Sequence, residues 1–510
     1  MMSSSDPNSV PATADIAIIG ASAAGLAAAI FAAETASTVG IKLRIIALEG
    51  AHKPGAKILI SGGGRCNVTN EQITSQDYDG GSQPTIRNVL RAFDEQRTIE
   101  WMRSLGVELK LEPNGKYFPT NNKARTVLDG LLERVRQLGI QLRTSTRVTG
   151  IRPLHPGVPS QKFIAILQEA FELGRHAKPV NELMGHHTSV PNQKFLSGLR
   201  AEDELSSAHR TEYELTVDQT SASAESSVEA EPLFEISIQN SSPIYARRVI
   251  MATGGMALPK SGSDGAGLNW MRQLGHTIVP TTPALAPLLL SEEAPGPGAK
   301  FAEFAGITLP LRLILVNDTG KHLARRTGSV VFTHFGISGP AALDISRHIA
   351  RHTLQNPGPA RVLLGHPDLP TSEAADEWLQ QHIKTSPRRS VANAISAIYP
   401  ERIASALASG LGEKLNDLTR AERLELARRL AALPLTVIGN RGYSFAETTA
   451  GGVNLGEIDA RTMQSRRIPA MYLCGEILDV DGRIGGFNFQ WAWSTGYLAG
   501  RAAVESLTRR

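Results

Sequence analysis

The chain has 510 residues, 41% hydrophobic and 20% charged, a length that exceeds one hydrophobic core and predicts two or three domains. A formal net charge of +4 and 5% aromatic residues, with no Lys/Arg cluster interleaved with aromatics, do not favour nucleic-acid binding. Both cysteines, Cys66 and Cys474, lie in glycine-rich motifs, which argues against a disulfide framework and favours a reducing compartment.

The apolar run at 16–33 is expected to be neither a signal peptide nor a membrane span. The first basic residue is Lys42, so a positively charged n-region is missing. Gly20 and Gly25 within the run suit a strand–turn–helix unit better than a spanning helix. The Ser/Pro-rich segment 1–14 is predicted to be a disordered tail. We therefore expect a cytoplasmic protein without a membrane partner.

A βαβ unit is predicted at the start of the ordered chain. The apolar strand 16–19 breaks into the turn Gly20–Gly25, which opens an Ala-rich helix, and the next strand, 42–48, ends on Glu49. Ser22 stands at the centre of the turn and is small enough for a pyrophosphate to approach the backbone. The helix N-terminus would attract that anion, and Glu49 would accept hydrogen bonds from an adenosine ribose. The turn alone is equally compatible with plain packing, but the whole unit predicts a dinucleotide site.

The densest motif is Ser61-Gly-Gly-Gly-Arg-Cys-Asn-Val-Thr-Asn70. Three consecutive glycines cost backbone entropy and let a loop lie against a flat or charged ligand. Arg65 can neutralise a phosphate, while Asn67 and Asn70 can bond ring or ribitol groups. The alternative is a flexible surface loop. Cys66 is either a redox thiol beside a cofactor or, without a CxxC partner, a packing or hydrogen-bonding residue.

Composition changes several times along the rest of the chain. The segment 153–232 ends in a polar tract that cannot bury a core, which predicts a partly disordered insertion. Strand-like runs follow residue 276, and helical periodicity follows residue 346. The predicted parts are a tail at 1–14, three pieces of one nucleotide-binding domain at 15–152, 233–275 and 440–510, the insertion at 153–232, a β-rich substrate domain at 276–345 and a helical domain at 346–439.

Two later segments can return to the same ligand. An apolar strand ends in Thr253-Gly254, where backbone can approach the adenosine half of a dinucleotide, and the glycine-rich loop 260–267 after it is either a ligand loop or a simple turn. Roughly 450 residues after the first turn, Gly475-Glu476 follows a strand, and Gly485–Asn488 opens a helix whose N–H groups can face an anionic ring edge. This return is typical of FAD proteins rather than NAD dehydrogenases. Since no second clean G-x-G-x-x-G follows a strand, a dedicated NAD(P)H domain is not expected.

Four motifs resemble those of the BaiN-like flavoproteins, also described as the aminoacetone oxidase family of FAD-binding enzymes: Lys57–Asn70, Phe332–Pro340, Glu447–Val453 and Gly475–Gly482. The resemblance spans the chain from Asp15 to Gly500. It implies an α/β fold with a discontinuous glutathione-reductase-like (Rossmann-type) FAD-binding domain that carries inserted β-rich and helical domains. It also implies an NAD(P)/FAD-dependent oxidoreductase that acts on a small molecule. Two departures are Ser22 in place of the usual central glycine and the length of the insertion.

By matching positions, the resemblance assigns FAD contacts to many residues and leaves the catalytic residue unknown. The implied cofactor-binding residues are Gly20, Ser22, Ala23, Ala24, Gly25, Glu49, Ser61, Gly62, Gly63, Gly64, Arg65, Cys66, Asn67, Val148, Thr253, Gly254, Gly475, Glu476, Gly485, Gly486, Phe487 and Asn488.

Other polar residues keep two interpretations. Asp479 and Asp481 would bond a ribitol chain or cap turns. His334 would act as a general acid in the cofactor cleft or bond within a turn. The histidines of the insertion have no companion ligands, so no metal site is predicted.

The predicted function is that of an FAD-dependent oxidoreductase, which passes hydride between the flavin and a small-molecule substrate or NAD(P)H as a transient donor. Within this class, an amine oxidase and a C=C reductase fed by NAD(P)H are both compatible with the sequence. A flavin-binding redox regulator that uses 153–232 as a partner surface is the alternative from another class, and that protein partner is unknown.

Overall fold

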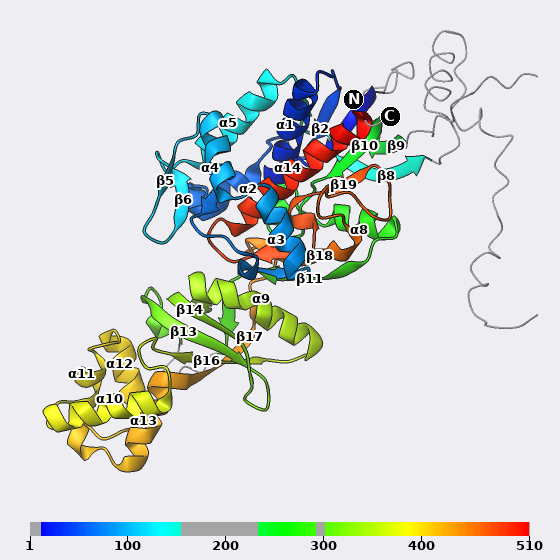
Figure 1. The fold of residues 1–510 in the computed structure, drawn as a ribbon. Helices are drawn as coiled ribbons and strands as arrows, with labels where there is room; N and C mark the ends of the chain where they lie inside the picture. Colours follow the sequence, from blue (N-terminus) through cyan, green and yellow to red (C-terminus); the bar gives the residue numbers. More distant parts are fainter. Residues whose placement is uncertain (1–11, 155–232, 292–300, 509–510) are drawn as a thin grey trace, which may run out of the picture. The chain divides into compact units, whose positions relative to one another are not determined.

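A mixed, mainly parallel sheet assembled from three distant segments organises the chain, as the computed structural model shows (Figure 1). The structure describes residues 12–154, 233–291 and 301–508. Ala12–Pro153 and Phe234–Arg510 form one unit by their contacts. The predicted tail and insertion lie almost entirely outside the described residues.

The sheet has the strand order β7-β2-β1-β10-β9-β8, and β19 also pairs with β10. β1 runs parallel to β2 and β10, with Ile18 opposite Ala47 and Ile250. These strands are apolar and buried, as a parallel sheet covered on both faces requires. The predicted α/β, Rossmann-type fold is therefore confirmed. The strands are β1 (Ala12–Ile19), β2 (Ile45–Leu48), β7 (Gln141–Arg143), β8 (Val148–Leu154), β9 (Leu233–Ile238), β10 (Ser241–Met251) and β19 (Met471–Leu473).

Two helices from opposite ends of the chain, α1 and α14, lie side by side against this sheet (Figure 1). Their approach depends on small residues, because a Cβ on Gly500 would lie 2.3 Å from the carbonyl oxygen of Ala28. Residues 83–104 form two helices rather than one, since Asp94 caps a new helix by accepting from the Arg97 amide. The helices are α1 (Ala23–Thr38), α2 (Ala56–Gly64), α3 (Gln83–Ala92), α4 (Glu95–Ser104), α5 (Ala124–Gln137), α8 (Ala266–Gln273) and α14 (Phe487–Thr508).

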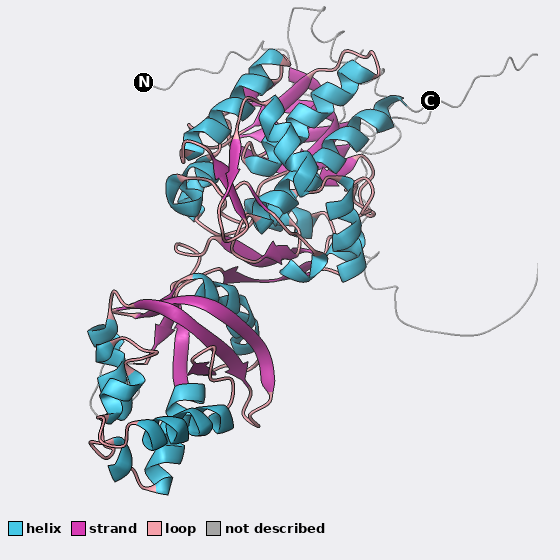
Figure 2. Cartoon of the chain, turned by 60° about the vertical axis from the view of Figure 1, so that its left-hand side comes forward, coloured by secondary structure: helices cyan, strands magenta, loops and turns pink. Residues whose placement is uncertain are grey.

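A closed barrel forms a second core, in the order β12-β15-β14-β13-β16-β17. Figure 2 shows its long, bent strands in magenta. Side chains of β17 alternate between buried and exposed, as expected for a strand with one face on the core. The strands are β12 (Leu288–Leu290), β13 (Thr308–Val316), β14 (His322–Thr333), β15 (Gly336–Ser338), β16 (Ala360–Gly365) and β17 (Leu433–Asn440).

The barrel changes the expected division between β-rich and helical parts. Two of its strands, β16 and β17 (the latter except for its last residue), fall inside 346–439, which the sequence predicts to be helical. They are short and flank four helices, so helical periodicity dominates the pattern of that region. Thr419 and Glu422 form a capping box at the start of α13. The helices are α9 (Pro340–Gln355), α10 (Ser372–Thr385), α11 (Val391–Ile395), α12 (Glu401–Ala408) and α13 (Arg420–Ala432).

Small antiparallel ladders complete the unit. β11 pairs with β18, β20 with β4, and β6 with both β3 and β5. β11 is the last strand before the barrel segment, and β18 is the first strand after it. These two strands therefore carry the chain between the two cores. The strands are β3 (Thr69–Asn70), β4 (Tyr78–Gly80), β5 (Leu109–Leu111), β6 (Lys116–Pro119), β11 (Ile278–Ala284), β18 (Thr448–Val453) and β20 (Val480–Gly482).

A buried ion-pair cluster connects the barrel helix α9 to β4 and β20. The Arg347 guanidinium donates to Asp481 Oδ1 at 2.8 Å and pairs with Asp79 Oδ1 at 3.0 Å. Burial raises the pKa of Asp481 to about 7, against the lowering effect of Arg347. The side chain of Asp481 is therefore held by an arginine from another part of the fold.

Candidate functional site

A cavity of about 490 Å³ lies where β1, β2 and β10 end. This is the edge at which open α/β sheets bind ligands, and the volume is within the usual range for small-molecule sites. Five residues of the predicted set, Gly25, Gly63, Gly64, Cys66 and Phe487, do not line the cavity. Those that line it are Gly20, Ser22, Ala23, Ala24, Glu49, Ser61, Gly62, Arg65, Asn67, Val148, Thr253, Gly254, Gly475, Glu476, Gly485, Gly486 and Asn488.

The first turn is fixed by its two glycines. Gly20 has φ +99°, and a Cβ there would lie 2.4 Å from the carbonyl oxygen of Ala252. A Cβ on Gly25 would lie 1.8 Å from the carbonyl oxygen of Gly20. Ser22 caps α1 in an extended conformation, and its side chain makes no capping hydrogen bond. The turn thus leaves the N-terminus of α1 open toward the cavity, where it favours an anion.

Glu49 is held in place by backbone amides. Its two carboxylate oxygens accept hydrogen bonds from the amides of Ala21 at 3.0 Å and Ala51 at 2.9 Å. A carboxylate has about four lone-pair sites, so it can still accept hydrogen bonds from a ligand. This geometry fits the predicted contact with a ribose diol.

The glycine-rich loop ends α2 with a kink, at which Gly62 has φ +55° and Gly63 has φ +68°. Arg65 does not offer a free charge at this point, because its Nη1 lies 2.7 Å from Glu112 Oε1. Its guanidinium also lies over the Phe118 ring, 3.9 Å from the centroid. The structure thus gives Arg65 a protein partner at the edge of the cavity.

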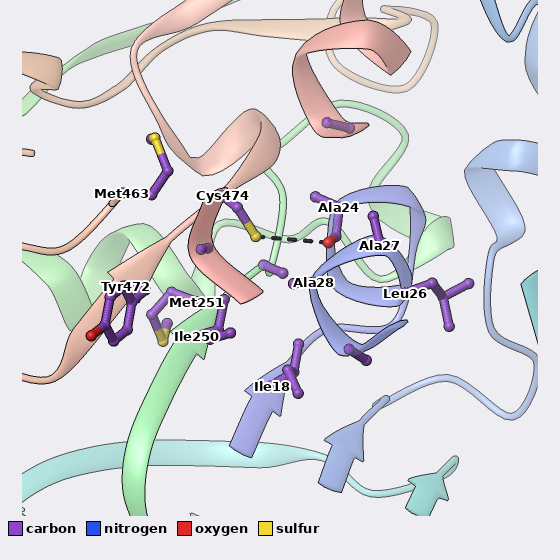
Figure 3. Close-up of a cluster of buried hydrophobic side chains, with 14 of the residues drawn as sticks. Ile18, Ala24, Leu26, Ala27, Ala28, Ile250, Met251, Met463, Tyr472 and Cys474 are labelled. Atoms are coloured by element: carbon purple, nitrogen blue, oxygen red, sulfur yellow. Dashed lines mark hydrogen bonds between the residues drawn. The ribbon is translucent and has the colours of Figure 1, made fainter. Parts of the chain in front are cut away.

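The two cysteines are predicted to resist thiol reagents in the native protein. Both side chains are fully buried, and burial raises the pKa of Cys66 to about 12 and that of Cys474 further. Figure 3 shows Cys474 against α1, where its Sγ donates to the Ala24 carbonyl. We expect no labelling by iodoacetamide near pH 8, measured by intact mass, and two labels after unfolding in guanidinium. Rapid native labelling of Cys66 would restore its interpretation as a redox thiol.

A charged network crosses the cavity wall near Gly475. Lys57 Nζ lies 2.8 Å from Glu476 Oε2, and Glu476 Oε1 accepts from the Thr449 hydroxyl at 2.8 Å. The same hydroxyl oxygen accepts the amide of Met256 at 2.8 Å. Lys57 and Thr449 are not among the predicted site residues, although both lie in the family-like motifs. Their motif positions are the signal that could have identified them.

The second glycine turn places the N-terminus of α14 at the cavity. Gly486 has φ +95°, and a Cβ there would lie 2.6 Å from the Thr69 carbonyl oxygen. Asn488 braces this turn, since its side-chain amide accepts from the Gly482 amide at 2.8 Å and donates to the Gly482 carbonyl at 2.9 Å. Phe487 instead packs against the Tyr78 ring.

Three buried polar atoms on the cavity wall have no hydrogen-bond partner: Asn67 Oδ1, Thr253 Oγ1 and Trp491 Nε1. Such atoms destabilise a protein by about 1–3 kcal/mol each unless a ligand or water satisfies them. They include one acceptor, one donor and one hydroxyl that does both. This set fits a flavin, whose ring carries both donors and acceptors.

Several candidates lie away from the cavity. His334 is exposed in the turn between β14 and β15, and the structure does not bring it to the cavity wall. Asp479 and Asp481 also lie off the cavity lining, with Asp481 bound by Arg347. Over the described ranges, no cluster of His, Cys, Asp and Glu is suited to a metal ion. In the same ranges, no helix combines the length and apolar character that crossing a bilayer requires.

The fold and the cavity define an α/β protein that binds a dinucleotide-type cofactor. The chain belongs to the HI0933-like family, because the model for the HI0933-like protein Rossmann domain matches residues 14–163 and 201–502. The expected family, FAD-binding and BaiN-like, is thereby confirmed. The chain is an FAD-dependent oxidoreductase, and the residues of the cavity fit that cofactor.

Relatives match the chain over nearly all of its length. The 3-dehydro-bile acid delta(4,6)-reductase of Clostridium scindens is 29% identical, over 96% of this chain and 99% of its own. The ribosomal RNA dihydrouridine synthase of Escherichia coli is 25% identical, over 96% and 98%. Among solved structures, the 3-ketosteroid-delta4-(5alpha)-dehydrogenase of Rhodococcus jostii gives a TM-score of 0.42 and 13% identity, over 99% and 98%.

Proposed function

We propose that this protein reduces a C=C bond conjugated to a carbonyl group, with NAD(P)H as the electron donor. The observation that supports this most directly is shared chemistry among the full-length relatives. One is named a delta(4,6)-reductase of a 3-dehydro bile acid and another a dihydrouridine synthase. In both names, hydrogen is added across a double bond of an electron-poor ring. The names of these relatives give no comparable support to an amine oxidase activity.

The cavity residues would hold the cofactor in an extended form, from the first turn to the second. Glu49 and the N-terminus of α1 would bind the ribose and pyrophosphate, while Asn67, Thr253 and Trp491 would satisfy their free polar atoms on it. The N-terminus of α14 stabilises negative charge at its end of the cavity. Bound FAD supplies hydride chemistry, and the protein supplies orientation and electrostatics.

NAD(P)H is proposed as a transient donor rather than a resident ligand. The sequence has one dinucleotide turn after a strand and no second clean one. That turn and Glu49 both face the cavity proposed for FAD. A nicotinamide donor would therefore reach the flavin, leave, and make room for the oxidised substrate.

The proposal predicts a yellow protein whose flavin bands bleach on anaerobic addition of NADH or NADPH. An enone should then restore the oxidised spectrum, because it accepts the electrons. The measurement is anaerobic absorbance, with cyclohexenone, a steroid enone and uridine-containing ribosomal RNA tested as acceptors. RNA as the effective acceptor would identify a nucleic-acid substrate and overturn the sequence-based expectation of no nucleic acid.

Two outcomes would contradict the proposal. Bleaching by aminoacetone alone, with no response to NAD(P)H, would favour an amine oxidase. If oxygen reoxidises the reduced flavin but neither an enone nor RNA does, enones and RNA are excluded as substrates. The redox-regulator alternative depends on 153–232, which lies almost entirely outside the described residues, and membership of the enzyme family does not favour it.

A further inference from the structure

Two charged side chains of the cavity have no assigned task. Among the cavity-lining charges within the described residues, only Lys116 and Glu447 have neither a hydrogen-bond partner nor an ion-pair partner. The others are bound by protein groups, which are backbone amides for Glu49 and side chains for Lys57, Arg65, Arg147, Asp264, Glu476 and Arg483. A side chain that points into a cavity without a protein partner is available to a substrate.

Lys116 lies beside the second glycine turn, and Glu447 lies within range of Lys116 and of Asp344, which accepts the Ile484 amide next to that turn at 2.7 Å. Lys116 begins β6, and its Cε would be 3.5 Å from a Cβ placed on Gly485. Glu447 directly precedes β18, and its backbone amide donates to the Leu285 carbonyl at 3.2 Å. The charge of Lys116 acts on the carboxyl group of Glu447. An ammonium and a carboxyl group therefore share the end of the cavity where the ring of the cofactor is proposed.

The surroundings of Glu447 raise the pKa of its carboxyl group. Glu447 is an exposed residue that opens onto the cavity, and the protein atoms around it desolvate its carboxyl group. Burial raises the pKa of Glu447, Lys116 opposes that rise, and the carboxylate of Asp344 reinforces it. Arg483 lies beside Asp344, with Nε 3.7 Å from Oδ2, and moderates that repulsion. A carboxyl group whose pKa is raised keeps its proton to a higher pH than an ordinary glutamate and can release it to a substrate.

We propose that Glu447 is the catalytic acid of this site and that Lys116 binds the carbonyl oxygen of the substrate. This inference rests on the proposed function. Hydride, supplied by NAD(P)H through the flavin, adds at the β-carbon of the enone. Its electron pair displaces the C=C electrons toward the carbonyl oxygen, which Lys116 stabilises. Glu447 then gives its proton to the α-carbon, so the product is a saturated ketone. Water in the cavity returns a proton to the carboxylate.

The first test separates the two half-reactions by anaerobic rapid mixing. In Glu447→Gln, flavin reduction by NAD(P)H should stay within about twofold of wild type, whereas reoxidation by the enone should slow about 10²- to 10⁴-fold. Glu447→Asp, which keeps a carboxyl group, should recover part of the rate. Lys116→Met should slow reoxidation about 10²- to 10³-fold, as loss of one oxyanion donor does. Glu71→Gln, an exposed carboxylate outside the cavity, is the matched control and should match wild type.

The second test needs no electron transfer. With oxidised flavin, the wild-type protein should exchange the α-hydrogens of cyclohexanone or a saturated steroid ketone with D2O, followed by NMR. Here the Glu447 carboxylate acts as a base, so exchange should rise with pH while enone-driven reoxidation falls over the same pH range. Both pH dependences should disappear in Glu447→Gln, whose FAD content is checked by absorbance.

The outcomes distinguish the two proposals. If wild-type flavin is reoxidised by an enone and Glu447→Gln is equally fast, the assignment of Glu447 is wrong and the proposed function stands. If no enone reoxidises the wild-type protein, the proposed function fails first. If Glu447→Gln loses FAD, Glu447→Asp replaces it in both tests. A pH profile of Glu447→Asp that coincides with that of the wild type within experimental error would also overturn the assignment.

Discussion

Replacing Gly25 by alanine is expected to give a protein that no longer retains FAD. A Cβ at this position would lie 1.8 Å from the Gly20 carbonyl oxygen, so backbone must move. Strain of about 3 kcal/mol, at the upper end for overpacking, corresponds to about a 100-fold loss of affinity when the cofactor needs the unstrained turn. Gly25 does not line the cavity itself, so the effect acts through the shape of the turn. The measurement is FAD content after dialysis, followed by titration of apoprotein.

Gly150→Ala is the matched control. Gly150, like Gly25, has no left-handed φ, and the nearest atom to a Cβ there is Ser237 Oγ at 4.0 Å. This variant should bind FAD as wild type does. Equal FAD affinity in Gly25→Ala and wild type would refute the proposed role of the turn.

Replacing Arg347 by methionine is expected to lower the free energy of unfolding by about 3–5 kcal/mol near pH 8, the usual result of removing one partner of a buried pair. Asp481 and Asp79 would then lose their shared cation. Thermal and urea unfolding midpoints measure the change. Arg136→Met removes an exposed pair with Glu133 and should have a much smaller effect.

The pH dependence of this variant has a defined sign. The pKa of Asp481 is about 7 in the folded protein against an ordinary value of 3.8. The folded state thus keeps a proton that the unfolded chain has lost, and stability contributed by Asp481 falls as pH rises between these values. Without Arg347 the pKa of Asp481 should rise further, so the deficit of Arg347→Met should grow above pH 7. Asp79, Asp479, His348 and Arg326 lie near enough to shape this curve. A deficit independent of pH would exclude Asp481 as its origin.

Local pattern predicted the nucleotide-binding sheet well because its signals are short in range. Apolar strands 16–19 and 42–48 flank a glycine turn, and each part of this unit is readable within about ten residues. The barrel is harder to predict from the sequence. Its strands β16 and β17 are separated in sequence by helices α10 to α13, and pairing across that distance has no local signature.

The site followed the same rule. Glycines and Glu49 were recognised from motifs, and the structure brings most of the predicted residues to one cavity. Phe487 and Cys66 belong to those motifs but point into packing, a distinction that depends on side-chain direction. Lys116 lies in none of the recognised motifs, and Glu447, although it begins the motif Glu447–Val453, has no recognisable spacing to Lys116. Only the tertiary fold places an ammonium and a carboxyl group at the same end of the cavity.

The pairing of α1 with α14 has a consequence for biosynthesis. α1 is an Ala-rich helix buried on nearly every side, and roughly 450 residues separate it from the helix that covers it. At about 5–20 residues per second, a ribosome takes about 20–90 s to make that interval. During this time the apolar surface of α1 lacks its final partner, so the nascent chain is an expected client of chaperones.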